Sequence, residues 1–368
     1  MTFQIAIGCN VRKSPYFDAT VADGVKSFSV YNHMFAPSHF GDPEGEYRAL
    51  IENVVMWDVA CERQVELSGP HAEKLVRYLT TRDVSSIAVG QGKYVPICDY
   101  DGNLINDPVL QKLSDDCFWL SIADSDILLW ASAIAAERGL EVRVTEPDAS
   151  PLGVQGPRAD DVVADLLGDW VRELKYFWFR ETDLDGIPLL LARSGWSKQG
   201  GFELYLRDAS RGTDLYNRVK EAGASYGIVP SAPSDIERVE SGLLSYGADA
   251  RSNVNPFEAG LGAFVDLDRD DDFVGKSALQ RIAKEGVRRR RVGFVIGGDR
   301  ISGITEQSNV YLGQDVVGAM TEAVYSPRLD KNIAVGMLGT DIADDEQGLE
   351  AAIGDERRPV SVSRLPFC

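Results

Sequence analysis

Two carboxylates of this sequence lie inside predicted strands, where an acid is either solvated or held in a site. Glu203 lies just inside the return strand of a predicted hairpin whose long, glycine-containing tip carries Trp196. Asp107 lies in the strand that follows a predicted turn at Asp101-Gly102, directly before Pro108. For each acid the local pattern leaves two interpretations open: a side chain that faces water, or a polar group that belongs to a site.

Two further groups of polar side chains could serve a site, and each also has a structural interpretation. Residues 31–34 (Tyr-Asn-His-Met) either line a pocket or pack their segment onto another part of the protein. Arg238 lies on a predicted helix within residues 230–244, where a surface pair with a neighbouring acid is the commoner role of an arginine. The pattern alone does not choose between these roles.

The motifs of common catalytic chemistry are absent from the sequence. It contains no P-loop, no Gly-x-Gly-x-x-Gly between a strand and a helix, no Gly-x-Ser-x-Gly elbow and no His-x-x-x-His pair. The histidines are His33, His39 and His71, and no third imidazole or thiolate lies near the first two in sequence. A zinc site is therefore not expected, and we predict no bound metal.

Composition predicts a globular protein of a reducing compartment. Of 368 residues, 44% are hydrophobic and 26% are charged, which is ordinary for globular proteins. The net charge of −19 argues against nucleic acid or an anionic membrane as partner, because both favour a basic surface. The five cysteines form no Cys-x-x-Cys pair, and the sequence has no signal peptide or membrane-spanning run, so we expect a cytoplasmic location.

The candidate residues lie on elements that follow a repeated β-turn-helix order. Residues 187–192 and 202–206 form the predicted hairpin, whose alternation places Glu203 and Tyr205 on the face opposite its apolar side chains. Residues 65–70 echo residues 152–157, and each stretch leads into a helical pattern, which predicts two related α+β lobes.

The last part of the chain has a different pattern. From residue 288 onward, short strands broken by glycines predict a small antiparallel β-barrel or sandwich. The section opens with the basic run 288–291. In so acidic a chain we expect these arginines to form intramolecular ion pairs rather than a nucleic-acid surface.

Five motifs occur in one order over most of the chain: Val154-Gln-Gly-Pro157, Ser194-Gly-Trp-Ser-Lys-Gln-Gly-Gly-Phe-Glu203, Arg238-Val-Glu-Ser-Gly242, Asn255-Pro-Phe-Glu-Ala-Gly260 and Phe273-Val-Gly-Lys-Ser-Ala-Leu279. Together they resemble the folate-dependent glycine cleavage T-protein (aminomethyltransferase) family. The resemblance implies an α+β, three-domain cloverleaf around a central tetrahydrofolate channel, with a C-terminal antiparallel β-barrel-like domain. It implies a discontinuous folate-binding domain (1–50 and 146–260), a second α+β lobe (51–145) and the barrel (280–368).

The resemblance also implies roles for the two carboxylates. In the family, the acid of the Gly-Phe-Glu motif reads the pterin ring, which implies that Glu203 accepts two parallel N–H bonds from the amino-pyrimidinone edge. An Asp on the strand after the second-lobe turn lies near the reacting one-carbon unit, which implies a catalytic role for Asp107. That role is to offset a cation, orient a water or receive a proton.

Departures from the T-protein pattern indicate a branch of the family. The family usually has Thr-Gly-Tyr-Thr-Gly-Glu where this chain has Ser194-Gly-Trp-Ser-Lys-Gln199, and Asp-Asp at Asn106-Asp107. These variants resemble the dimethylsulfoniopropionate demethylase branch. That implies methyl transfer from a sulfonium to tetrahydrofolate, with 3-(methylthio)propionate and 5-methyltetrahydrofolate as products. Because the leaving thioether is neutral, the reaction needs alignment of the reacting atoms rather than an acid or a nucleophile.

The remaining predicted site residues follow from this chemistry. Aromatic faces can stabilise a sulfonium cation, and Trp196 is the aromatic that most separates this chain from the T-protein. For Arg238, a contact with the folate tail and a structural ion pair both remain open. The predicted folate contacts beside Glu203 are Trp196, Tyr94, Phe177 and Arg238, and the predicted substrate contacts are Tyr31, Trp178, Ser121, Tyr205 and Lys93.

Two other function classes remain open. One is a different one-carbon enzyme, either an aminomethyltransferase acting on a lipoyl-bound group or a demethylase of a methylated amine or aryl ether. The other is a non-catalytic folate-binding module like those of iron–sulfur cluster assembly, which rely on a cysteine motif. No cysteine lies within the five motifs. We expect a small-molecule substrate and folate as partners, and leave a homodimer open.

Overall fold

The computed structural model describes residues 8–251, 253–303 and 306–368. Residues 1–7, 252 and 304–305, which fall in the predicted domains 1–50, 146–260 and 280–368, lie outside the described residues. The chain forms two compact units, each assembled from several segments. Unit 1 comprises Met1–Leu75, Ile87–Lys93 and Val109–Ser234, and unit 2 comprises Val76–Ser86, Tyr94–Pro108 and Asp235–Cys368.

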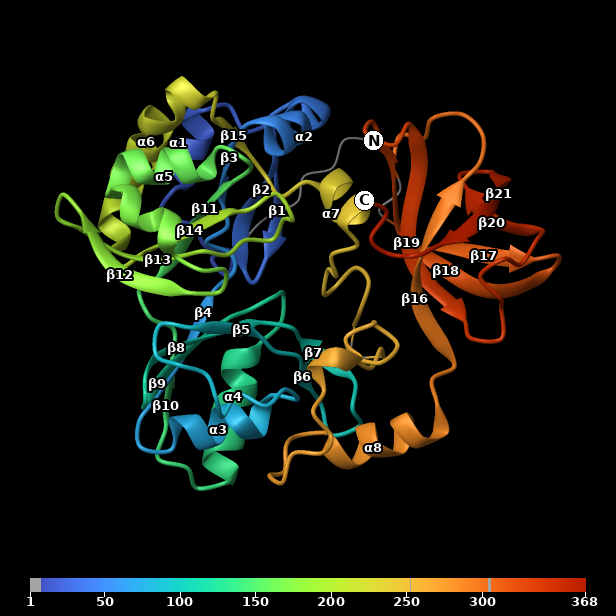
Figure 1. Cartoon of the computed structure of the whole chain (residues 1–368), viewed down its shortest axis with the longest axis horizontal. Helices are drawn as coiled ribbons and strands as arrows, with labels where there is room; N and C mark the ends of the chain where they lie inside the picture. The colour runs from blue at the N-terminus through green and yellow to red at the C-terminus, as the bar shows by residue number, and fades with distance from the viewer. Residues whose placement is uncertain (1–7, 252, 304–305) are drawn as a thin grey trace. The chain divides into compact units, whose positions relative to one another are not determined.

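Unit 1 contains a six-stranded sheet in the order β12-β13-β14-β11-β3-β15 (Figure 1). Its strands are β3 (Val55–Asp58), β11 (Ser150–Gln155), β12 (Phe179–Leu184), β13 (Ile187–Ala192), β14 (Gly201–Leu206) and β15 (Val229–Ser231). Neighbours are antiparallel except β15, which runs parallel to β3. The predicted hairpin is confirmed by the pairing of β13 with β14. Strand β3 pairs with β11, although its residues fall in the predicted lobe 51–145.

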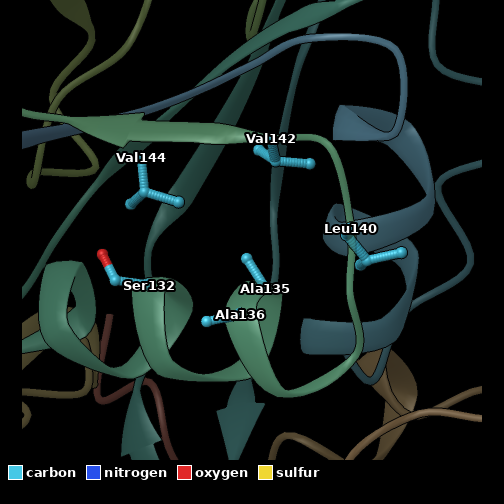
Figure 2. A pocket seen from close by; sticks show the side chains of 6 residues that line it. All are labelled: Ser132, Ala135, Ala136, Leu140, Val142 and Val144. Carbon is cyan, nitrogen blue, oxygen red and sulfur yellow. The ribbon is translucent and has the colours of Figure 1, made fainter.

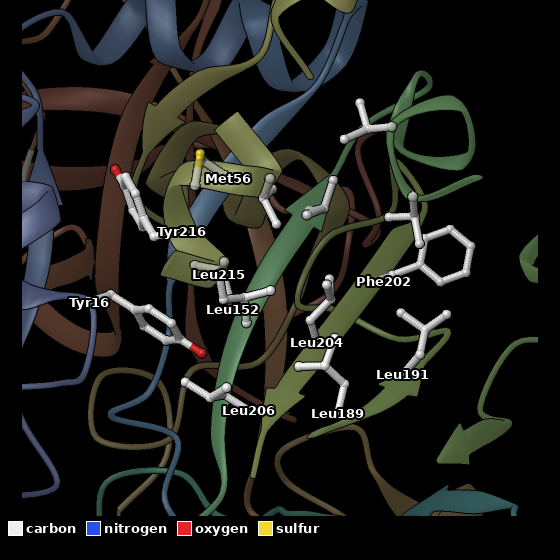
Figure 3. Close-up of a cluster of buried hydrophobic side chains, with 14 of the residues drawn as sticks. Tyr16, Met56, Leu152, Leu189, Leu191, Phe202, Leu204, Leu206, Leu215 and Tyr216 are labelled. Atoms are coloured by element: carbon white, nitrogen blue, oxygen red, sulfur yellow. The ribbon is translucent and has the colours of Figure 1, made fainter. Parts of the chain in front are cut away.

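Apolar side chains from one face of this sheet form a core with three helices (Figure 3). The helices are α1 (Phe17–Ala22), α5 (Ala159–Leu167) and α6 (Gly212–Gly223). Phe202, Leu204 and Leu206 of β14 lie in this core, while Tyr205 lies in a second cluster with Trp119. Because successive strand residues point to opposite faces, Glu203 shares the face of Tyr205, as the sequence predicts.

A five-stranded sheet, ordered β10-β4-β9-β8-β5, contributes Trp119 of β9 to the second cluster. Its strands are β4 (Gln64–Ser68), β5 (Gly92–Tyr94), β8 (Val109–Ser114), β9 (Cys117–Ser121) and β10 (Arg143–Thr145), and α3 (Ala72–Leu79) and α4 (Ile127–Glu137) accompany it. The predicted repeat is confirmed locally, because β4 and β11 each lead through Gly-Pro into a helix. Gly69 and Gly156 both have positive φ, 128° and 120°, which glycine adopts without strain.

A separate hairpin contains residues 31–34. Strands β1 (Ser27–Tyr31) and β2 (Met34–His39) turn through Asn32 and His33, whose φ values are positive, and α2 (Pro43–Glu52) follows. The buried Asn32 amide donates to the carbonyl oxygens of Cys61 and Ala123. Asn32 therefore has the structural role that the sequence left open, whereas Met34 both packs in the core and lines a cavity of unit 1.

Unit 2 contains a closed antiparallel barrel, β16-β19-β18-β17-β20-β21, which confirms the predicted C-terminal barrel. Its strands are β16 (Arg289–Ile296), β17 (Ser308–Leu312), β18 (Asp315–Ser326), β19 (Lys331–Gly339), β20 (Leu349–Ile353) and β21 (Glu356–Ser363). Helices α7 (Asp235–Ser241) and α8 (Lys276–Glu285) precede the barrel, and β6 (Ile97–Cys98) pairs with β7 (Leu104–Asn106).

Shorter elements complete the two units. The 3-10 helices are η1 (Asp169–Glu173), η2 (Ala209–Arg211), η3 (Ala224–Tyr226) and η4 (Gly262–Phe264). Across the described parts of the chain, no helix has the length and apolar character needed to cross a membrane.

Candidate functional site

Glu203 is a buried carboxylate held by two hydroxyl groups. Its side chain is 7% exposed, so the interpretation of a water-facing acid is wrong. Ser194 Oγ and the Tyr205 hydroxyl donate hydrogen bonds of 2.5 and 2.9 Å to Oε2 of Glu203. Burial raises the pKa of Glu203, and these two hydrogen bonds oppose the rise because they favour the ionised form. The cross-strand neighbours of Glu203 are the small residues Gly153 and Ala192.

Gln155 fixes the loop that carries Trp196. The Gln155 amide nitrogen donates to the carbonyl oxygens of Ser194 and Phe202, and its oxygen accepts from Ser197 Oγ at 2.9 Å. Glycine is required beside it, since an added Cβ at residue 195 would lie 2.1 Å from Gln155 Nε2. Trp196 itself is half-buried on this loop.

The predicted aromatic residues Phe177 and Trp178 are tied to the base of the same hairpin. Phe177 N donates to the Arg193 carbonyl and Arg193 N donates to the Trp178 carbonyl, each at 2.9 Å. Phe177 adopts a φ of 61°, which is uncommon for a residue with a side chain and costs of order 1 kcal/mol. Its carbonyl accepts from Gly92 N, which places the strand of Lys93 next to this segment.

Tyr205 and Ser121, both predicted as substrate contacts, lie inside the protein. Tyr205 is fully buried and its ring lies 6.3 Å from that of Trp119. Ser121 Oγ accepts from Gln64 Nε2 at 2.9 Å and is also hydrogen-bonded to the Tyr205 hydroxyl. Tyr31 and Lys93 are half-buried.

Unit 2 holds the second predicted carboxylate, Asp107. It follows β7 rather than lying within it, because pairing ends at Asn106. The Tyr94 hydroxyl donates to Asp107 Oδ2 at 2.8 Å, so the structure joins two predicted site residues. Burial raises the pKa of Asp107 to about 7. The hydrogen bond from Tyr94 lowers this pKa, and the negative charge of Asp249 raises it further.

Arg238 lies in a buried ionic cluster of unit 2. Its side chain is 1% exposed and its guanidinium donates to Asp249 at 2.9 Å and to Glu322 at 3.0 Å. The expectation of a surface pair is therefore wrong: Arg238 does form an ion pair, but a buried one. Burial raises the pKa of Asp249, but the charges of Arg238 and Arg291 outweigh burial, so this pKa lies below its usual value.

The predicted intramolecular pairs are confirmed for three arginines of the basic run. Arg289, Arg290 and Arg291 pair with acids at distances of 3.2, 2.7 and 2.9 Å. Their partners are Glu258, Asp344 and Asp249.

Comparison with known proteins shows which family the chain belongs to. Residues 16–269 match the GCVT N-terminal domain, and residues 289–368 match the glycine cleavage T-protein C-terminal barrel domain. The chain belongs to the glycine cleavage T-protein family. Members of this family are folate-dependent transferases, so the protein is an enzyme that takes tetrahydrofolate as a co-substrate together with a small-molecule substrate.

Individual relatives differ in how closely they resemble this T-protein family member. Dimethylsulfoniopropionate demethylase DmdA of Ruegeria pomeroyi is 42% identical over 96% of both chains. An aminomethyltransferase of Alkaliphilus oremlandii is 29% identical over 90% of this chain and 91% of its own. The crystal structure of the glycine cleavage system aminomethyltransferase T from Bartonella henselae has the same fold, with a TM-score of 0.85 at 22% identity over 97% of this chain and 98% of its own.

In its described part, unit 1 contains two cavities, and neither is lined by the predicted catalytic, folate or substrate contacts. One, of about 170 Å³, is lined mainly by apolar side chains of α4 and the segment leading into β10 (Figure 2). Its one polar side chain, Ser132, donates to the Leu128 carbonyl, so it offers a ligand little polar contact. The other, of about 530 Å³, contains Glu146 paired with both Arg12 and Arg63.

Several residues of the site were missed by sequence reasoning. Gln155 and Ser194 lie within the five ordered motifs. Their spacing does not indicate that Gln155 holds the loop of Trp196 or that Ser194 donates to Glu203. Gln64 carries no sequence signal at all. Within the described ranges, no three His, Cys, Asp or Glu side chains lie together as metal ligands would.

Proposed function

We propose that this protein demethylates dimethylsulfoniopropionate, transferring one methyl group from the sulfonium sulfur to nitrogen 5 of tetrahydrofolate. The observation that carries the proposal is the 42% identity with DmdA over 96% of both chains, against 29% with the aminomethyltransferase of Alkaliphilus oremlandii. The C–S bond breaks as the N–C bond forms, and nitrogen 5 loses a proton. The products are 3-(methylthio)propionate and 5-methyltetrahydrofolate.

Glu203 is the proposed ligand of the pterin ring. A carboxylate accepts two parallel N–H bonds, which suits the amino-pyrimidinone edge of a folate. The fit is supported by the burial of Glu203, by the hydroxyls that hold its Oε2, and by the small side chains across the strand from it. In such surroundings the acid accepts directional bonds without competition from bulk water.

Asp107 is the proposed acceptor of the proton that nitrogen 5 loses. A general base works best when its pKa lies near the working pH, and burial brings that of Asp107 to about 7. The Tyr94 hydroxyl fixes the carboxylate through Oδ2. Tyr94 is accordingly proposed to orient Asp107, in addition to the folate contact predicted for it.

The proposed contacts of the sulfonium are aromatic. Trp196, Phe177 and Trp178 belong to one hydrogen-bonded group of segments in unit 1, and aromatic faces contribute about 0.5–2 kcal/mol each to a desolvated cation. Tyr31 is a further proposed contact. Lys93 is the proposed partner of the substrate carboxylate, since its ammonium is the charged donor among the predicted substrate contacts. For Arg238 we propose the structural role, because Asp249 and Glu322 hold its guanidinium.

Purified protein incubated with tetrahydrofolate and one methyl donor at a time tests this function. We expect 5-methyltetrahydrofolate with dimethylsulfoniopropionate, and little with glycine betaine, a methylated amine or an aminomethylated lipoyl protein. Turnover restricted to the lipoyl protein would favour the aminomethyltransferase alternative. Folate binding without turnover of any donor would favour a non-catalytic module.

Two broader properties belong to the proposal. We propose a cytoplasmic location, supported by five cysteines that form no disulfide in the described structure. A homodimer stays a prediction, which light scattering of the purified protein measures.

A further inference from the structure

We infer that Ser121 and Gln64 are positioning residues for Glu203, acting through Tyr205 in one directed chain of hydrogen bonds. The chain runs from the Gln64 amide to Ser121, from Ser121 to Tyr205, and from Tyr205 to the Glu203 carboxylate. The inference rests on the proposed role of Glu203 in binding the pterin ring.

The partners and burial of these residues define the chain. Gln64 Nε2 donates to Ser121 Oγ at 2.9 Å, Ser121 is hydrogen-bonded to the Tyr205 hydroxyl, and that hydroxyl donates to Glu203 Oε2 at 2.9 Å. All four side chains are buried. Gln64 and Ser121 lie opposite each other on β4 and β9, whereas Tyr205 and Glu203 lie on β14 of the other sheet.

The direction of the chain is fixed at both ends. Gln64 Nε2 also donates to the Glu62 carbonyl oxygen at 2.7 Å, and a carbonyl only accepts. The nitrogen of the Gln64 amide, rather than its oxygen, therefore faces Ser121. The amide oxygen of Gln64 is left buried without a hydrogen-bond partner. At the other end an ionised carboxylate only accepts. The two hydroxyls between them are therefore oriented toward Glu203.

Such a chain favours the ionised form of Glu203. Hydrogen bonds in a low-dielectric interior polarise one another, and donors aimed at a carboxylate lower its pKa. Two titratable groups interact with this acid: Tyr205 on its own strand donates to it, and Tyr176 before β12 feels its charge. The charge of Glu62, before β4, acts on Tyr205. Burial raises the pKa of Glu203, and the hydroxyl donors oppose that rise. Without Ser121, the Tyr205 hydroxyl would lose the bond that directs it.

The pH dependence of folate binding tests the chain. Calorimetry measures the Kd of 5-methyltetrahydrofolate for the full-length protein from acid to neutral pH. Protonation of Glu203 weakens binding on the acid side, so we expect Tyr205→Phe to move that midpoint upward by about 0.5–1 pH unit. Ser121→Ala should move it upward by a smaller amount, and Ser121→Thr, which keeps the hydroxyl, should leave it unchanged. Gln64→Met should move the midpoint by about as much as Ser121→Ala does. Ser132→Ala, in the α4 cavity, is the control and should keep the midpoint of the unmodified protein.

The outcomes separate this inference from the proposed function. If Ser121→Ala weakens binding equally at every pH with an unchanged midpoint, the residue is merely structural and the inference is wrong. An unchanged midpoint in both Ser121→Ala and Gln64→Met overturns it as well, provided that Glu203→Gln loses binding. Unchanged binding in Glu203→Gln would instead overturn the pterin assignment, and the inference with it.

Discussion

The Tyr205 hydroxyl and the Glu203 carboxylate are joined by a 2.9 Å hydrogen bond along one face of β14. The bond exists because residues two apart on a strand share a face, and because both side chains are buried there. Ser194 adds a second donor to the same carboxylate oxygen, Oε2. A buried acid held in this way is suited to recognising a polar ring edge.

Glu203→Gln should weaken the binding of 5-methyltetrahydrofolate by about 10- to 100-fold, because a charge-assisted hydrogen bond contributes about 1.5–3 kcal/mol. The amide would also present a donor to groups that themselves donate. Titration calorimetry at neutral pH measures the change. Glu181→Gln, on the exposed part of β12, is the matched control and should bind normally. Equal affinities in the two variants would mean that Glu203 does not contact the pterin.

Asp107 should impose a pH dependence on methyl transfer. Its pKa is raised to about 7, and the ionised form present above that pH accepts the proton, so kcat/KM should rise with pH through a midpoint near 7. Asp107→Asn should lower kcat by about 10²- to 10⁴-fold and abolish this rise. Initial rates across the neutral range, measured in both proteins, give the two profiles.

Tyr94→Phe provides the internal check on that assignment. The Tyr94 hydroxyl lowers the pKa of Asp107, so removing it should move the midpoint of the rate profile to higher pH. A midpoint that stays in place, or an Asp107→Asn variant with the original profile, would place the titrating group elsewhere.

Trp196→Leu should raise KM for dimethylsulfoniopropionate by about 2- to 30-fold, the range expected for losing one cation–π contact. Trp196→Phe keeps a weaker aromatic face and should lose less. Steady-state kinetics at saturating tetrahydrofolate measure both variants. Equal losses in Leu and Phe would point to packing rather than to an aromatic face. Trp170→Leu, whose ring faces Arg180 in the same unit, controls for loss of a large aromatic side chain.

Arg238→Met should destabilise unit 2 by about 3–5 kcal/mol, because it leaves the buried carboxylates of Asp249 and Glu322 without a principal counter-charge. Urea unfolding followed by circular dichroism measures the loss. Arg218→Met is the control, since Arg218 pairs with Asp185 and Asp214 on the exposed surface of α6 and should change little. Similar unfolding midpoints in the two variants would contradict the structural role of Arg238.

The hairpin of Glu203 shows how much of the site could be predicted from the sequence. Its alternation predicts the strands and the shared face of Glu203 and Tyr205, because side-chain direction on a strand is a local property. The burial of Glu203 could not be predicted in the same way. Its neighbour Tyr205 contacts Ser121 and Trp119, which come from another sheet and have no fixed spacing to β14.

For Arg238 in unit 2, too, the local sequence predicts the element but not the partners of the side chain. Helical spacing predicts α7, although the structure limits it to Asp235–Ser241. The partners of Arg238 lie 11 and 84 residues further along the chain, so local charge patterning could not place them. The expectation of a surface pair followed the commoner case and was wrong because the barrel strand β18 supplies Glu322.

Transfer of an isotopically labelled methyl group tests the proposed function most directly. Purified protein is incubated with tetrahydrofolate and dimethylsulfoniopropionate deuterated at both S-methyl groups, and the products are followed by mass spectrometry. We expect 5-methyltetrahydrofolate carrying one intact deuterated methyl group, formed in equal amounts with 3-(methylthio)propionate that keeps the other. Unlabelled 5-methyltetrahydrofolate, or thioether released without any methylated folate, would contradict methyl transfer from the sulfonium.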